Sequence, residues 1–131
     1  MSGRDRAPLL LIVDDEPRIL SALRRALRRE SFEILAVETP AEALRVFAAH
    51  EVDLVLSDYK MPGMTGLQLL ARLAERRPAV VRMLITGWTE AIPEPEMREV
   101  GVYAVINKPW DVDSLRETLR QALKQASSPD L

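Results

Sequence analysis

The stretch at residues 9–17 reads LLLIVDDEP, and it decides the fold class. Its apolar run, Leu9 to Val13, is short, continuous and rich in branched side chains, which predicts a strand buried on both faces. The run ends abruptly at Asp14, and Pro17 then suits the first turn of a helix. A strand buried on both faces is typical of a parallel sheet, because each face needs helices to cover it.

The same alternation continues along the chain. A helix is expected over residues 17–29, where Leu20, Leu23 and Leu27 recur at helical spacing. Four further apolar runs predict strands, at residues 33–37, 53–57, 79–85 and 102–106. Helices are expected between and after them, over residues 40–50, residues 66–77 and a last amphipathic segment that is capped by Asp111 or Asp113. This pattern predicts an α/β fold with a parallel sheet and helices on both faces.

The composition is that of one compact domain. The chain has 131 residues, of which 47% are hydrophobic, and its 18 basic side chains nearly balance its 20 acidic ones. We therefore expect no direct binding of nucleic acid and no membrane attachment. Cysteine is absent and no apolar run approaches the roughly 20 residues that span a bilayer, so the expected location is cytoplasmic. We predict one domain over residues 1–125, with residues 126–131 as a polar C-terminal tail or the start of a linker.

Polar side chains follow the ends of four predicted strands. Asp14 and Asp15 follow the first strand, Asp58 the third, Thr86 the fourth and Lys108 the fifth. Ligands of open α/β sheets bind beyond the carboxyl ends of the strands, so these side chains are expected to converge. Carboxylates at such short range need a counter-cation, and Mg²⁺ fits a site of oxygen ligands. Asp58 is the best placed nucleophile toward a phosphoryl group, whose oxygens Lys108 and Thr86 would hold.

The motifs around these residues resemble those of the receiver domains of bacterial two-component response regulators. They occur in the right order across residues 8–125, and they are LLIVDDEP at residues 10–17, VLSDYKMPGMTGLQLL at 55–70, LITGW at 84–88 and INKPW at 106–110. The resemblance implies a flavodoxin-like fold, in which the five parallel strands have the order 2-1-3-4-5.

The same resemblance implies a phosphorylation-dependent signalling switch. Asp58 is then the phospho-acceptor, which takes the group from a histidine of a sensor kinase or phosphotransfer protein. Lys108 would pair with the phosphoryl oxygens, and Thr86 would move to hydrogen-bond them. Mg²⁺ would be held by three carboxylates and one backbone carbonyl, namely those of Asp14, Asp15, Asp58 and Lys60. Such a domain is not an enzyme in the usual sense, because it catalyses only its own phosphoryl transfer and dephosphorylation.

The resemblance also assigns roles around the pocket. Lys60 and Trp88, two positions beyond Asp58 and Thr86, would gate access of water to the acyl phosphate. The Lys108-Pro109 peptide bond is expected to be cis. Partner contacts are expected on the first helix and beside Lys108, at Arg18, Ile19, Pro109 and Trp110. An unidentified effector domain or protein would receive the signal, and a homodimer is a further option.

Two departures from the family pattern leave an alternative open. Val105 stands three residues before Lys108, where receivers commonly carry the aromatic ring of their switch. Pro93 and Pro95 predict a fourth helix that is short, late-starting or irregular. These features motivate a receiver-like module that dimerises or docks independently of phosphorylation. A phosphatase with an aspartyl nucleophile is a third hypothesis, and the lack of a substrate-covering insertion argues against it.

Overall fold

A five-stranded parallel sheet forms the centre of the molecule. The structure is a computed structural model that describes residues 6–87 and 91–127. The predicted sheet is confirmed, with the order β2-β1-β3-β4-β5 and every neighbouring pair parallel. The strands are β1 (Leu9–Val13), β2 (Glu33–Val37), β3 (Leu54–Asp58), β4 (Val81–Gly87) and β5 (Val102–Lys108).

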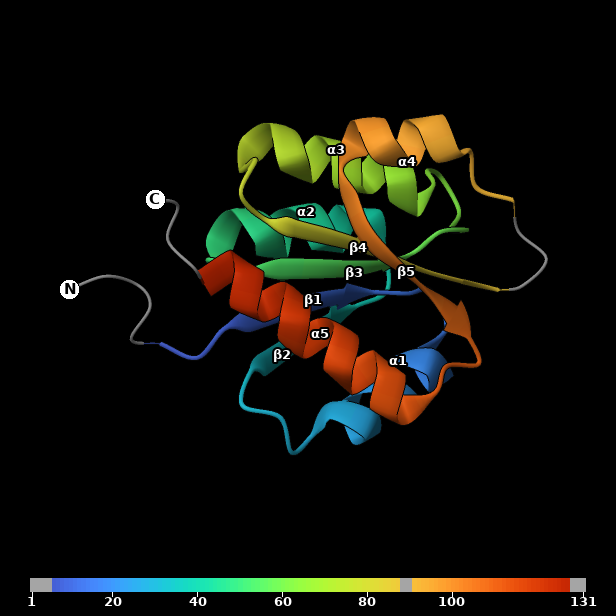
Figure 1. Cartoon of the computed structure of the whole chain (residues 1–131). Coiled ribbons are helices and arrows are strands. Elements are labelled where there is room, and N and C mark those ends of the chain that lie inside the picture. The colour runs from blue at the N-terminus through green and yellow to red at the C-terminus, as the bar shows by residue number, and fades with distance from the viewer. Residues whose placement is uncertain (1–5, 88–90, 128–131) are drawn as a thin grey trace.

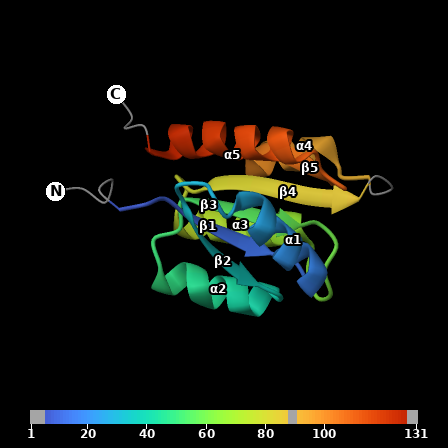
Figure 2. The same cartoon turned by 90° about the horizontal axis from the view of Figure 1, so that it is seen from below.

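Five helices connect the strands and cover both faces of the sheet. They are α1 (Pro17–Leu27), α2 (Pro40–Ala49), α3 (Gly66–Arg76), α4 (Glu94–Val100) and α5 (Val112–Ser127). Helices α1 and α5 lie on one face, and α2, α3 and α4 lie on the other (Figures 1 and 2). Within the described ranges, no helix is long and apolar enough to cross a membrane.

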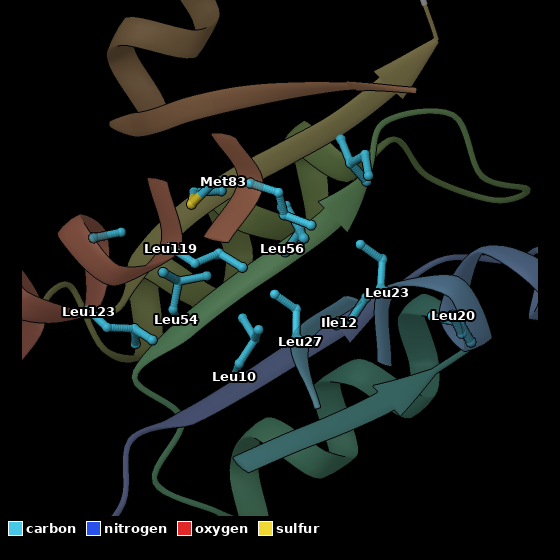
Figure 3. Packing of buried hydrophobic residues seen from close by; sticks show 13 residues of the cluster. Leu10, Ile12, Leu20, Leu23, Leu27, Leu54, Leu56, Met83, Leu119 and Leu123 are labelled. Atoms are coloured by element: carbon cyan, nitrogen blue, oxygen red, sulfur yellow. The ribbon is translucent and has the colours of Figure 1, made fainter. Parts of the chain in front are cut away.

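The opening apolar run supplies side chains to two separate cores. Leu10 and Ile12 pack with the leucines of α1 and α5, whereas Leu11 and Val13 pack with α2 and α3. Figure 3 shows the first of these cores, in which Leu23 and Leu27 of α1 approach Leu10 and Ile12. The alternation follows from strand geometry, since successive side chains point to opposite faces. Continuous hydrophobicity in β1 therefore reflects a strand that is covered on both sides.

Capping side chains explain where three of the helices begin. Thr39 Oγ1 accepts a hydrogen bond from the backbone N–H of Glu42 at the start of α2. Thr65 and Gln68 form a reciprocal capping box at the start of α3. Asp111 caps α5 by accepting from the backbone N–H of Ser114, so Asp111 is the cap and not Asp113.

The fourth helix is short, as its prolines predict. It has seven residues and starts at Glu94, with Pro93 at the N-cap and Pro95 in the first turn. Proline is tolerated there because the first backbone N–H groups of a helix have no partner within the helix. The predicted cis peptide bond at Lys108-Pro109 is also present.

Several predicted boundaries are wrong by one or two residues. Pairing between neighbouring strands continues beyond the apolar residues. It includes the pairs Asp58 with Ile85, Thr86 with Asn107, and Gly87 with Lys108. Backbone hydrogen bonds do not require apolar side chains, so β3, β4 and β5 end later than hydrophobicity indicates. The predicted site residues of these three strands therefore lie within the strands and not after them. At the other end of the chain, α5 continues through Ser127.

Candidate functional site

The carboxyl ends of β1, β3 and β5 meet around a cavity of about 600 Å³. Its lining includes Asp15, Asp58, Lys60 and Lys108, which come from segments far apart in the sequence. Asp14 follows β1 directly and is fully buried. The structure thus brings the predicted acidic residues and Lys108 together at the predicted edge of the sheet.

Three carboxylates in this pocket are close enough to share one cation. Oxygen atoms of Asp14, Asp15 and Asp58 all lie within 4.8 Å of one another. Asp14 Oδ1 accepts a hydrogen bond of 2.9 Å from the backbone N–H of Glu16. Asp14 Oδ2 is buried, and within the part of the chain that the structure describes no well-aligned hydrogen bond satisfies it, although the ammonium of Lys108 lies 3.1 Å away. Such an oxygen in an acidic cluster fits the ligand preference of a hard divalent cation.

Lys108 supplies positive charge to the same carboxylates. Its Nζ lies 3.1 Å from Asp14 Oδ2, 3.2 Å from Asp58 Oδ1 and 3.5 Å from Glu16 Oε1. The Lys108 side chain is 17% exposed, so these ion pairs are partly shielded from water. One ammonium therefore faces three carboxylates, two of them buried.

Burial and like charge set the protonation of the pocket. Loss of hydration and the charge of Asp14 raise the pKa of Asp58 to about 6, although Lys108 opposes the change. Loss of hydration also raises the pKa of Asp14, against the opposing effects of the Glu16 N–H and Lys108. Burial lowers the pKa of Lys108, but its attraction to Asp14 and Asp58 outweighs this effect and raises it. At neutral pH the ionised pocket therefore carries surplus negative charge.

Thr86 lies at the end of β4, beside the pocket. It is buried, and its Oγ1 donates a hydrogen bond of 3.3 Å to the carbonyl oxygen of Gly87, which lines the cavity. Thr86 pairs with Asn107 on β5, one residue before Lys108. The backbone of β4 and β5 thus places Thr86 and Lys108 on adjacent strands at the same edge.

The remaining predicted site residues surround this pocket to different degrees. Lys60 is exposed at the mouth of the cavity, and Trp88 lies outside the described residues. Val105 is 36% exposed and borders a second hollow of about 330 Å³ between α4 and β5. On the predicted partner surface, Arg18 and Pro109 are exposed, whereas the other two residues, Ile19 and Trp110, are half-buried against the core.

The structure reveals a role of Gly66 that the sequence reasoning missed. A Cβ atom at Gly66 would lie 2.1 Å from the carbonyl oxygen of Asp58, which is closer than any side chain tolerates. The Gly66 N–H also donates to the carbonyl oxygen of Tyr59 at 2.7 Å. Gly66 thus lets the loop after β3 close tightly on the acidic pocket. Its position directly after a capping threonine was the available signal.

Comparison with known proteins identifies the family. The response regulator receiver domain family matches residues 10–120. The chain belongs to this family. The receiver domain is 40% identical over 121 residues to the hydrogenase transcriptional regulatory protein HoxA of Cupriavidus necator, covering 92% of this chain and 25% of that protein. It is 34% identical over 118 residues to the transcriptional regulatory protein GlrR of Escherichia coli, covering 90% of this chain and 27% of that protein.

Solved structures show the same fold. The receiver domain of an HD domain-containing protein from Pseudomonas fluorescens has a TM-score of 0.88 and 34% identity, and the match covers 95% of this chain and all of that one. A CheY-like receiver domain protein from Methanospirillum hungatei has a TM-score of 0.85 and 28% identity, and the match covers 92% of this chain and 96% of that one. This receiver domain spans about a quarter of the length of HoxA and GlrR.

Proposed function

We propose that this receiver domain accepts a phosphoryl group on Asp58 from a histidine of a sensor kinase or phosphotransfer protein. The observation that carries the proposal is the environment of Asp58, whose carboxylate lies 3.2 Å from Lys108 and within 4.8 Å of two further aspartates. Asp58 also lines an open cavity, so a donor has a route to the buried carboxylate.

The transfer step requires an ionised and accessible carboxylate. An Asp58 oxygen donates an electron pair to phosphorus, while the bond from phosphorus to the donor histidine nitrogen breaks and leaves its electron pair on the imidazole. A pKa of about 6 leaves Asp58 mostly ionised at neutral pH. Asp58 is therefore available as a nucleophile under ordinary cellular conditions.

We assign a Mg²⁺ site to Asp14, Asp15, Asp58 and the backbone carbonyl of Lys60. Two observations support this assignment. Carboxylates outnumber the cations in the pocket, and the buried Asp14 Oδ2 has the Lys108 ammonium 3.1 Å away but no well-aligned hydrogen bond within the described residues. When bound, Mg²⁺ neutralises negative charge on the carboxylates and on a transferred phosphoryl group. Without it, the incoming group would meet several carboxylates and only partial compensation from Lys108.

Lys108 and Thr86 complete the proposed site. Lys108 already contacts Asp58 and would stay beside a phosphoryl oxygen on that residue. Thr86 would exchange its hydrogen bond to Gly87 for one to the phosphoryl group. Lys60 would control the approach of water at the mouth of the cavity, together with Trp88. Val105 offers no ring to follow the movement of Thr86, so the exposed α4–β5 surface would transmit the change by another route.

The proposed output is a change in how the domain contacts an effector domain or protein. HoxA and GlrR are named transcriptional regulatory proteins, and both are about four times as long as the matched region. We propose that this receiver domain likewise controls a separate output unit. Arg18, Ile19, Pro109 and Trp110 remain the proposed partner contacts.

The proposal is tested by mass spectrometry of the intact chain. The wild type and Asp58→Asn would be incubated with Mg²⁺ and a small acyl phosphate, with Asp113→Asn as a matched control on the exposed first turn of α5. We expect one phosphoryl adduct on the wild type and on Asp113→Asn, and none on Asp58→Asn. An adduct that persists on Asp58→Asn would assign the acceptor elsewhere. No adduct on any variant, together with no binding of beryllofluoride, would favour the phosphorylation-independent docking module.

A further inference from the structure

Glu16 occupies the N-cap position of α1 without capping the helix. Its backbone is extended there, with φ −105° and ψ 108°, yet its side chain accepts no hydrogen bond from the first turn of α1, all of which the structure describes. Helices α2, α3 and α5 instead begin with the capping side chains Thr39, Thr65 and Asp111. Short polar residues are preferred at this position. Helix stability therefore does not explain the side chain of Glu16.

The Glu16 side chain extends toward Lys108 instead. Its Oε1 lies 3.5 Å from Lys108 Nζ, and Glu16 lines the same cavity as Asp15 and Asp58. The Glu16 side chain is 63% exposed, whereas that of Asp58 is 6% exposed and that of Asp14 is fully buried. Glu16 is thus the carboxylate partner of Lys108 that lies on the solvent side of the pocket.

Three carboxylates already surround the ammonium of Lys108. A lysine ammonium has three N–H groups, and three carboxylates lie within 3.5 Å of Nζ. A phosphoryl group that approaches the ionised Asp58 therefore meets an ammonium that is already surrounded by carboxylates, and it must compete with them for Lys108 until the new bond forms. Asp14 is buried and stays charged throughout, and Asp58 is buried and stays charged until it bonds to phosphorus, whereas Glu16 can turn into water. The longest distance also belongs to Glu16, so Glu16 is the partner that is displaced at the lowest cost.

We propose that Glu16 is a positioning residue that competes with the phosphoryl group for Lys108. In the unphosphorylated domain it holds the ammonium toward the mouth of the pocket, and it releases the ammonium when a phosphoryl group arrives. This inference rests on the proposed phosphoryl transfer to Asp58. Because Glu16 competes for Lys108, it is expected to limit the rate and the extent of phosphorylation.

Three variants separate this role from simpler ones. Glu16→Gln keeps the size of the side chain and removes its charge. Glu16→Asp keeps the charge, but its side chain is one methylene shorter. Because aspartate is also a better helix cap, its carboxylate should leave Lys108 and accept hydrogen bonds from the first turn of α1. Glu75→Gln removes the same charge from an exposed position near the end of α3 and serves as the control.

The measurements are the rate of adduct formation with a small acyl phosphate and the affinity for beryllofluoride, both at saturating Mg²⁺. We expect Glu16→Gln to raise both by about two- to tenfold, the range for removing one like charge near the incoming anion. Glu16→Asp should resemble Glu16→Gln, and Glu75→Gln should match the wild type. Melting temperatures identify any variant whose fold has changed.

Two results would overturn the role of Glu16 while leaving the proposed function intact. In the first, the wild type forms an adduct on Asp58 and Glu16→Gln forms it at the same rate. In the second, Glu16→Asp behaves as the wild type while Glu16→Gln is faster, which would mean that the charge acts without contacting Lys108. Absence of an adduct on the wild type would instead contradict the proposed function, and the inference about Glu16 with it.

Discussion

Two carboxylates of this receiver domain have side chains of the same low exposure, but their pKa values are shifted in opposite directions. The side chains of Asp58 and Glu30 are each 6% exposed. Two arginines hydrogen-bond Glu30, with Arg116 Nε at 3.0 Å and the Arg120 guanidinium at 2.8 and 2.9 Å on its two oxygens. These contacts, led by Arg120, lower the pKa of Glu30, whereas burial and Asp14 raise the pKa of Asp58.

The difference lies in the ratio of carboxylates to cations. Glu30 has two guanidinium partners and connects the loop after α1 to α5. Asp58 shares the ammonium of Lys108 with Asp14 and Glu16. The first cluster is electrically satisfied and stabilises the fold, whereas the second retains negative charge that a ligand can neutralise. Low side-chain exposure alone therefore does not distinguish a structural carboxylate from a functional one.

The largest expected effect on stability is a gain on removing the charge of Asp58. The shift from 3.8 to about 6 means that ionising Asp58 costs the folded state up to about 3 kcal/mol. The pKa of Asp58 is higher in the folded state than in the unfolded state, so protonation of Asp58 favours folding. This stabilisation is complete below pH 3.8 and is lost as the pH rises through about 6. Asp58→Asn should therefore stabilise the metal-free domain at pH 7.5 and change it little near pH 4.

Urea unfolding of wild type and Asp58→Asn at the two pH values measures this effect. Asp113→Asn, on an exposed side chain, provides the matched control for an aspartate-to-asparagine change. An equal or lower stability of Asp58→Asn at pH 7.5 would remove the contrast between the two clusters.

A smaller loss is expected on removing the charge of Glu30. Glu30→Gln should destabilise the domain by about 1–2 kcal/mol at pH 7, less than for a fully buried pair because Arg116 and Arg120 are 32% and 53% exposed. The pKa of Glu30 is lower in the folded state than in the unfolded state. Ionised Glu30 therefore stabilises the fold above about pH 4.5, and this stabilisation is lost as the pH falls through the pKa of the folded state.

The control for Glu30 lies on the same side of the molecule. Glu117 is 60% exposed and 3.9 Å from Arg120, so Glu117→Gln should change the stability by less than about 0.5 kcal/mol. Urea unfolding of both variants compares them directly. Equal effects of the two substitutions would mean that the Glu30 cluster behaves as an ordinary surface ion pair.

The sequence predicts the acidic pocket better than it predicts the Glu30 cluster. Asp14, Asp58 and Lys108 each stand at the end of an apolar run, and the parallel sheet necessarily brings such ends to one edge. Glu30 and Arg120 are 90 residues apart, and no local pattern marks their contact. Their meeting depends on how the loop after α1 packs beside α5, which only the folded chain determines.

Local rules also fail where side chains have two competing partners. The sequence shows Glu16 at the start of a helix, but only the structure shows that its side chain contacts Lys108 and leaves the helix uncapped. Strand ends were similarly underestimated, because the backbone ladder continues through polar residues such as Asp58 and Thr86. The apolar cores that position these strands were predictable, since their side chains alternate between two covered faces.

The most direct test is a titration of the Asp58 carboxyl by carbon NMR, with and without Mg²⁺, using Asp58→Asn to assign the signal. We expect an apparent pKa near 6 in the absence of metal and a clear decrease when Mg²⁺ is added, because a bound cation stabilises the ionised form. An apparent pKa near 4 that Mg²⁺ leaves unchanged would contradict the claim that this pocket holds surplus negative charge for a cation and a phosphoryl group.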